Sequence, residues 1–133
     1  SQNLSKNIST KIFDIRKKLP FENNSIDACF SHMLYCMALT KLELININKE
    51  ICRILKPSGL NIYTVRNETD GDYQKGIHVA EDMYESDGFI VHFFDKDKVK
   101  SLLDGYSNIL IEKFEEGNFP RKLYFVLNKK LSN

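Results

Sequence analysis

The clearest pattern in the sequence is a helical spacing of apolar residues between positions 44 and 55. The apolar positions of this run are Leu44, Ile47, Ile51, Ile54 and Leu55. Intervals of three and four residues place them on one face of a helix of about four turns. Thr40 and Glu43 have the spacing of a capping box, in which each side chain bonds the backbone N–H of the other residue. The pattern predicts a helix that begins after Thr40 and that Lys56-Pro57-Ser58-Gly59 ends.

Short apolar segments on both sides of this helix predict strands. Residues 26–31 alternate between apolar and polar side chains, and residues 60–65 are rich in β-branched and aromatic side chains, as strands are. Two further strands are predicted at 108–114 and 122–128. The segment between them, EEGNFPR, contains the Gly and Pro of a hairpin turn. We also expect residues 11–15 to be the end of a strand.

Residues 66–94 have no single periodicity. The first part, 66–75, is polar, and the last part, 89–94, is apolar but interrupted by His92. Asp95 is a suitable N-cap for one more helix. That helix would carry Val99, Leu102, Leu103 and Tyr106.

The order of elements is therefore strand, helix, strand, insert, helix, strand, strand. Such alternation is typical of an α/β sheet that is parallel at first, and the closing hairpin makes the sheet mixed. We expect one domain over residues 1–133. Ligands of such sheets bind outside the carboxyl ends of the parallel strands, which here are Ser31-His32 and Val65-Arg66-Asn67.

Composition narrows the functional classes. The net charge is +1, which gives no reason to expect a nucleic acid or an anionic membrane as partner. The chain has no apolar run of 18 residues and no apolar core of a signal peptide near residue 1. A cytoplasmic location is the resulting expectation. The three cysteines are an odd number in apolar surroundings, which argues against a disulfide framework.

Two motifs suggest a ligand site but are incomplete. Cys29, His32 and Cys36 have the spacing C-x2-H-x3-C, yet a structural zinc site needs four ligands and no second pair lies nearby. We therefore expect no metal. Gly71 and Gly76 have the spacing of a phosphate loop, but Ile77-His78 follows where Lys and Ser or Thr are required.

Polar residues around the insert form a looser candidate set. Its members are Arg66, His78, Glu81, Tyr84 and His92. His92 stands between Val91 and Phe93, so it is either a buried histidine with satisfied hydrogen bonds or, if the insert covers the strand ends, a general base. Asp14 also has two possible roles, because an acid after a strand can be a solvated turn residue or an acceptor for an exocyclic amine.

Two sequence blocks together resemble those of class I S-adenosylmethionine-dependent methyltransferases. The first is Asp14-x4-Leu19-Pro20-Phe21-x-Asn23-x-Ser25-x-Asp27-x2-Phe30-Ser31. The second is Arg53-x-Leu55-Lys56-Pro57-x-Gly59-Leu60, in which Ser58 replaces the first glycine of the family's block. Residues 95–128 resemble the family's last helix and closing hairpin. The resemblance covers residues from about 11 to the end.

The resemblance implies a Rossmann-like methyltransferase fold with S-adenosylmethionine as cofactor. It assigns Asp14 and the backbone N–H of Ile15 to the adenine, and Leu19 to the adenine face. Ser31 and His32 would lie beside the sulfonium and the transferred methyl group. Arg66 and Asn67 would lie on the substrate side, where the insert brings His78 and Tyr84. His32, His78 or His92 would take the proton from a small-molecule acceptor.

The resemblance also implies that the chain corresponds to the C-terminal two-thirds of the fold. The family's glycine-rich loop and its ribose-binding acid would belong before residue 11, so the cofactor site would be incomplete here. In the family's numbering the sheet would have the strand order 4-5-7-6, with strand 4 at an open edge. Such an edge favours pairing, for example in a homodimer. The alternative to an enzyme is a truncated, inactive binding or structural module.

Overall fold

The computed structural model describes residues 7–132, which form two β-sheets with two helices. The larger sheet has the strand order β1-β2-β7-β6. Its strands are β1 (Ile26–His32), β2 (Leu55–Arg66), β6 (Tyr106–Glu116) and β7 (Arg121–Lys130). β1 and β2 are parallel, whereas β7 is antiparallel to both of its neighbours. This is the predicted order 4-5-7-6 with its antiparallel hairpin, and the predicted fold class is confirmed.

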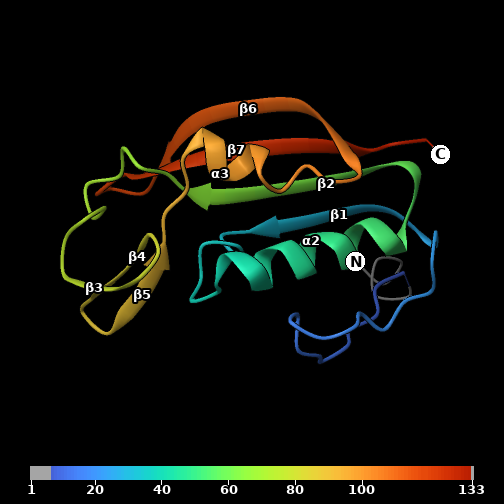
Figure 1. Cartoon of the computed structure of the whole chain (residues 1–133), viewed down its shortest axis with the longest axis horizontal. Helices are drawn as coiled ribbons and strands as arrows, with labels where there is room; N and C mark the ends of the chain where they lie inside the picture. The colour runs from blue at the N-terminus through green and yellow to red at the C-terminus, as the bar shows by residue number, and fades with distance from the viewer. Residues whose placement is uncertain (1–6, 133) are drawn as a thin grey trace.

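Helix α2 (Lys41–Ile54) forms as its sequence predicts. Thr40 Oγ1 accepts a hydrogen bond from the Glu43 N–H at 3.2 Å, and Glu43 Oε1 accepts one from the Thr40 N–H at 2.9 Å. These two bonds satisfy N–H groups that have no partner inside the helix. The helix ends at Ile54, and β2 begins at the next residue. Figure 1 shows α2 running alongside β1 and β2.

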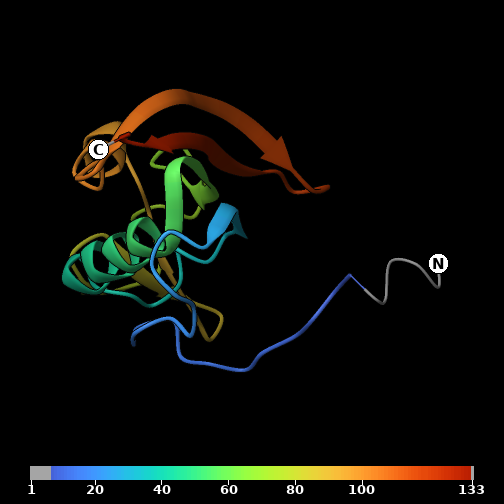
Figure 2. The same cartoon turned by 90° about the vertical axis from the view of Figure 1, so that its right-hand side faces the viewer.

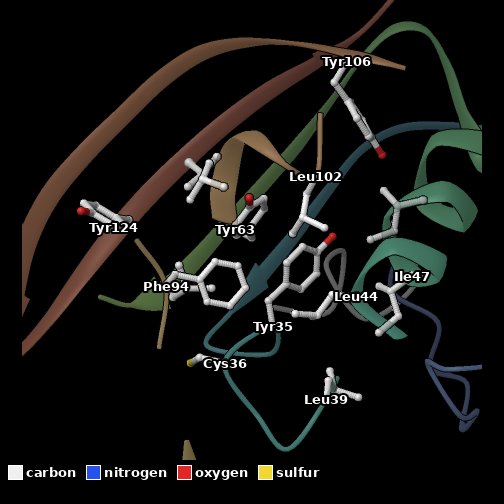
Figure 3. Close-up of a cluster of buried hydrophobic side chains, with 14 of the residues drawn as sticks. Tyr35, Cys36, Leu39, Leu44, Ile47, Tyr63, Phe94, Leu102, Tyr106 and Tyr124 are labelled. Atoms are coloured by element: carbon white, nitrogen blue, oxygen red, sulfur yellow. The ribbon is translucent and has the colours of Figure 1, made fainter. Parts of the chain in front are cut away.

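The hydrophobic core lies between one face of the large sheet and the two helices. The ring of Tyr35 stacks on that of Tyr63, with 4.3 Å between ring centroids. Figure 3 shows side chains of α2, of the sheet and of the segment after β1 converging around Tyr35. The Tyr35 hydroxyl donates to Asn48 Oδ1 at 2.7 Å, so this buried polar group is paired. The core thereby fixes the segment that follows β1.

The insert forms a second, three-stranded antiparallel sheet that the sequence pattern does not predict. Its strands are β3 (Ile77–Ala80), β4 (Met83–Ser86) and β5 (Phe89–His92). All four residues of β3 are exposed. A strand without a buried face lacks the alternation by which a strand is recognised in a sequence.

Two predicted elements differ from the structure. Helix α3 spans only Lys96–Lys100, although Asp95 caps it as expected by accepting the Lys98 N–H at 2.7 Å. Gly105 has a φ of +87°, and the chain turns there into β6. Tyr106 therefore begins a strand instead of ending a helix. The strand end expected at 11–15 is also wrong, since this segment has no regular structure.

The remaining features concern the surface. β1 lies at the edge of the large sheet, as expected, and Phe30 on it is 65% exposed. The pairing of this edge with another chain stays a prediction. Residues 7–13 are exposed and extend away from the sheet (Figure 2). Among the described residues no helix is both long and apolar enough to cross a membrane.

Candidate functional site

The parallel strands β1 and β2 end on the side of the molecule where the insert lies. Figure 1 shows both arrowheads pointing toward the small sheet, with the turn between β6 and β7 at the same end. β1 ends at His32 and β2 at Arg66. The topology therefore gathers the end of each parallel strand, the insert and the closing hairpin into one region, as ligand sites of α/β sheets require.

His32 is held by two partners from different strands. Its Nδ1 lies 2.7 Å from Thr64 Oγ1, and its Nε2 lies 3.1 Å from Glu116 Oε2. Thr64 Oγ1 also accepts the Met33 N–H at 2.9 Å. A hydroxyl can donate or accept, whereas a carboxylate only accepts. Both ring nitrogens of His32 therefore have a partner in the protein.

Arg66 is tied into a charge network with the buried Asp70 and the exposed Asp72. Its Nη2 lies 2.7 Å from Asp70 Oδ1 and 2.7 Å from Asp72 Oδ2. Burial disfavours ionisation of Asp70, but its hydrogen bonds, those from Arg66 first, outweigh this and lower its pKa. The guanidinium of Arg66 also lies over the Phe93 ring, 5.4 Å from its centroid. Its charge is thus already compensated by the protein.

A cavity of about 780 Å³ opens between the strand ends, the insert and the closing hairpin. This volume lies within the range of small-molecule sites, about 300–1,000 Å³. Its wall is a mixture of thioether, aromatic and charged side chains. The larger ones are Met33, Met37, Arg66, Asp70, Asp72, Lys75, Tyr84, Asp87, Phe89, Phe93, Phe119 and Arg121.

The structure brings only some of the predicted substrate residues to this cavity. Arg66 and Tyr84 line it. Asn67 is 1% exposed, and its Oδ1 accepts from the backbone N–H and hydroxyl of Thr69, so its side chain closes a turn instead of facing the cavity. His78 lies outside the lining on exposed β3, where its Nε2 is 2.7 Å from the Glu81 carbonyl oxygen.

His92 lies in the interior of the protein. It is fully buried, with Nδ1 2.6 Å from the Leu39 carbonyl oxygen and Nε2 2.7 Å from Lys98 Nζ. Both ring nitrogens are therefore occupied by the protein. Of the two readings of the sequence, the geometry favours the buried, hydrogen-bonded histidine over the general base.

The residues that the resemblance assigns to the adenine have partners of their own. Asp14 accepts two side-chain hydrogen bonds from Arg16, which together with the backbone N–H of Arg16 lower its pKa to about 2. Ile15 packs against the core. Leu19 is only 4% exposed and donates its N–H to Glu50 Oε1 at 2.8 Å. Leu19 therefore presents little surface to a ligand in this arrangement.

Ser31 differs from these residues because its hydroxyl is buried without a hydrogen-bond partner among the described residues. An unpartnered buried hydroxyl is costly, by about 1–3 kcal/mol, unless a ligand or water completes it. Ser31 is the last residue of β1 before His32. A polar ligand group at the end of β1 would satisfy it.

The cysteines do not gather into a metal site. Cys36 is buried and its Sγ lies 3.5 Å from the Met33 carbonyl oxygen, while Cys29 and Cys52 are half-buried. Burial raises the pKa of all three thiols. Residues 7–132 contain no group of three or more His, Cys, Asp or Glu side chains arranged to hold a metal.

Sequence reasoning missed most of the cavity wall. Met33 and Met37 follow β1, Phe89 begins β5 directly after a hairpin turn, and Phe119 lies in the turn between β6 and β7. A signal was present for the two phenylalanines, since each follows a glycine within two residues in a predicted polar turn or insert. Single exposed apolar side chains are common on protein surfaces, so this signal by itself does not locate the cavity.

The fold and the site together define the class of protein: a Rossmann-like α/β domain with a ligand cavity at the carboxyl ends of its parallel strands. The sequence model of the family described as "Methyltransferase domain" matches residues 1–63. The resemblance predicted from the two sequence blocks is confirmed, and the chain has the fold of S-adenosylmethionine-dependent methyltransferases. No curated protein matches the sequence.

Solved structures agree with this assignment along nearly the whole chain. A S-adenosylmethionine-dependent methyltransferase from Methanosarcina mazei has a TM-score of 0.77 and 18% identity over 92% of this chain and 67% of its own. A protein from Pyrococcus horikoshii has a TM-score of 0.71 and 22% identity over 97% and 62%. The N-methyltransferase NodS from Bradyrhizobium japonicum, in complex with S-adenosylhomocysteine, has a TM-score of 0.64 and 7% identity over 96% and 58%. The chain thus spans about three-fifths to two-thirds of their length.

Proposed function

We propose that this chain provides the acceptor side of a methyltransferase, which transfers a methyl group from S-adenosylmethionine to a small molecule. The observation that carries the proposal is the cavity of about 780 Å³ at the carboxyl ends of β1 and β2. The family match of residues 1–63 supports the reaction class. The complex of NodS with S-adenosylhomocysteine supports the cofactor class.

The residues at the end of β1 fit a bound cofactor in part. The unpartnered hydroxyl of Ser31 can receive a polar group there, and the carboxylate of Asp14 can accept an amine once Arg16 shares it. Leu19 does not fit a role on the adenine face without a movement of residues 14–20, because it is buried in the core. Bound S-adenosylmethionine supplies a methyl group already activated on its sulfonium.

The protein's own contribution is position and proton transfer. Cavity walls from the insert and the hairpin hold the acceptor and exclude water from one side, which aligns the acceptor atom for attack. His32 ends β1 directly before Met33; Met33 lines the cavity, whereas His32 is not among the lining residues. We assign to His32 the proton released by the acceptor. Because Nε2 already faces Glu116 Oε2 at 3.1 Å, the ring takes this proton at Nδ1, after the Thr64 hydroxyl turns its hydrogen away from that nitrogen.

An inactive binding or structural module is the second candidate. Two observations favour it: the buried position of Leu19 and the closure of Asp14 by Arg16. Both readings share the fold, so only cofactor binding and activity separate them.

Calorimetric titration of S-adenosylmethionine into the full chain tests the proposal. We expect a dissociation constant of about 100 µM or tighter, which corresponds to roughly −5.5 kcal/mol. Asp14→Asn should weaken binding about tenfold, because an amide removes the negative charge that the amine prefers. Asp104→Asn, a surface substitution in the turn before β6, is the matched control and should bind as the wild type does. Binding at this affinity would contradict the inactive module. Absence of binding would show only that this chain by itself does not hold the cofactor, which the incomplete site implied by the resemblance also predicts for part of an active enzyme.

A further inference from the structure

Two exposed phenylalanines stand at the cavity on hairpin turns that are far apart in the sequence. Phe89 follows the turn between β4 and β5 and is 75% exposed, and Phe119 lies in the turn between β6 and β7 and is 96% exposed. Both belong to the lining of the same cavity. Figure 1 shows the two hairpin turns at the same end of the molecule.

The turn before Phe89 presents its side chain in a defined way. Ser86 pairs with Phe89, and the two residues between them, Asp87 and Gly88, both have positive φ values of +51° and +82°. This is the two-residue turn that fits the twist of a β-hairpin. The backbone at Phe89 is thus fixed by the ladder of β4 and β5, so its exposure is built into the hairpin.

Charge in the cavity is balanced. The wall contains three cationic side chains, Arg66, Lys75 and Arg121, and three carboxylates, Asp70, Asp72 and Asp87. Arg66 is already paired with Asp70 and Asp72. The three cations and three carboxylates of the wall cancel in formal charge, so the wall has no net charge that would select an ionic ligand over a neutral one. The rest of the wall offers thioether and aromatic surface, including Met33, Met37 and Phe93, which adapts to flat apolar groups.

We propose that the cavity binds an uncharged aromatic small molecule, and that Phe89 and Phe119 are specificity residues that become buried against it. The inference rests on the proposed function, in which this molecule is the methyl acceptor. The exposed rings give the ligand aromatic contacts worth about 0.5–1.5 kcal/mol beyond area burial, roughly a two- to thirteenfold gain in affinity. Their burial on binding removes apolar surface from water in both partners.

Titration calorimetry on the full chain, without cofactor, tests the inference with three probes of similar size. 2-Naphthol is flat and uncharged, 2-decalol is its saturated and non-planar counterpart, and 2-naphthoate is flat and anionic. We expect 2-naphthol to bind about three- to tenfold more tightly than either of the others, with a negative heat-capacity change. Phe89→Ala and Phe119→Ala should each weaken 2-naphthol binding about three- to tenfold.

Phe30→Ala is the matched control, because Phe30 is also an exposed phenylalanine, at 65%, but lies on β1 outside the cavity lining. It should change 2-naphthol affinity by less than about twofold, and thermal melts should show all three variants folded. Equal binding of 2-naphthol and 2-decalol, tighter binding of 2-naphthoate, no binding of 2-naphthol, or unchanged affinity in both cavity variants would each overturn the inference. Because no cofactor is present, its failure is separate from a failure to bind S-adenosylmethionine.

Discussion

The ammonium group of Lys98 lies 2.7 Å from Nε2 of His92, inside the junction between the insert and α3. The other ring nitrogen of His92 faces the Leu39 carbonyl oxygen, which can only accept. Nδ1 therefore carries the proton, and Nε2 accepts from Lys98. Lys98 also donates to Asp82 Oδ2 and to the Phe93 carbonyl oxygen. This cluster joins β5, the loop before β4 and α3.

The cluster predicts a loss of stability below neutral pH. Burial, first, and the charge of Lys98 lower the pKa of His92, although the Leu39 carbonyl and the nearby Glu81 and Asp82 oppose them. A folded-state pKa below the unfolded value of 6.5 means that the native state resists protonation. The stabilising contribution is present above pH 6.5 and is lost as the pH falls below it.

Urea denaturation at pH 7.5 and pH 5.0 measures this effect. Wild-type protein should lose stability between the two values, and His92→Gln should lose less, because it has no imidazole to protonate. His78→Gln removes a surface histidine on β3 and should follow the wild type. An equal loss in wild type and His92→Gln would show that His92 does not control this range.

Thr64 should contribute to stability through its hydroxyl. The side chain is 3% exposed, and its Oγ1 contacts both His32 Nδ1 and the Met33 N–H. Thr64→Val has nearly the same shape but removes these bonds, so we expect a loss of about 0.5–1.5 kcal/mol in the free energy of unfolding. Thr64→Ser keeps the hydroxyl and should retain most of the bonding contribution. Chemical denaturation of the three proteins at pH 7.5 gives the comparison.

The two positive-φ glycines of the insert should respond very differently to alanine. At Gly76 a Cβ atom would lie 2.1 Å from the Glu85 carbonyl oxygen, next to the pairing of β3 with β4, whereas at Gly88 nothing lies within 4 Å. Gly88→Ala should cost about 1–2 kcal/mol from its backbone conformation alone. Gly76→Ala adds a clash with backbone, so it should cost clearly more and expose β3 amides to hydrogen exchange. Equal costs would show that β3 can move away freely.

How much of this structure the sequence predicts depends on where each element finds its partners. The capping box of Thr40 and Glu43 and the apolar face of α2 are local patterns, and both are present as predicted. Helix α3 is shorter than predicted because Leu102 lies in a turn after the helix and still packs into the core. Apolar spacing alone does not distinguish such a turn residue from a residue of the helix. β3 could not be predicted, since it exists through pairing with β4.

The candidate site, too, could be predicted only where its residues follow a local sequence pattern. The end of β1 at His32 follows from the strand pattern, and so does its position at a ligand edge. Glu116, by contrast, reaches His32 only because β6 follows β7 in the sheet order. Phe119 reaches the cavity through the same hairpin. Partners that meet through sheet topology leave no spacing in the sequence.

Ser58 connects a departure in the sequence to a feature of the backbone. It stands where the family's block has a glycine, and its φ is +66°. This conformation costs a residue with a Cβ atom about 1–2 kcal/mol, whereas glycine adopts it freely. Ser58→Gly should therefore stabilise the protein. The gain is reduced by the greater freedom of glycine in the unfolded chain, about 0.4–1 kcal/mol.

We expect a net increase of roughly 0.5–1 kcal/mol in the free energy of unfolding for Ser58→Gly, as a difference between these two effects. The hydroxyl of Ser58 contacts Ser132 Oγ at 3.0 Å on the surface, and its loss should matter little. Ser58→Ala is the control, because it removes the hydroxyl and keeps the strained φ, so it should give no gain. If Ser58→Ala stabilised the protein as much as Ser58→Gly, the backbone conformation would not be the cause.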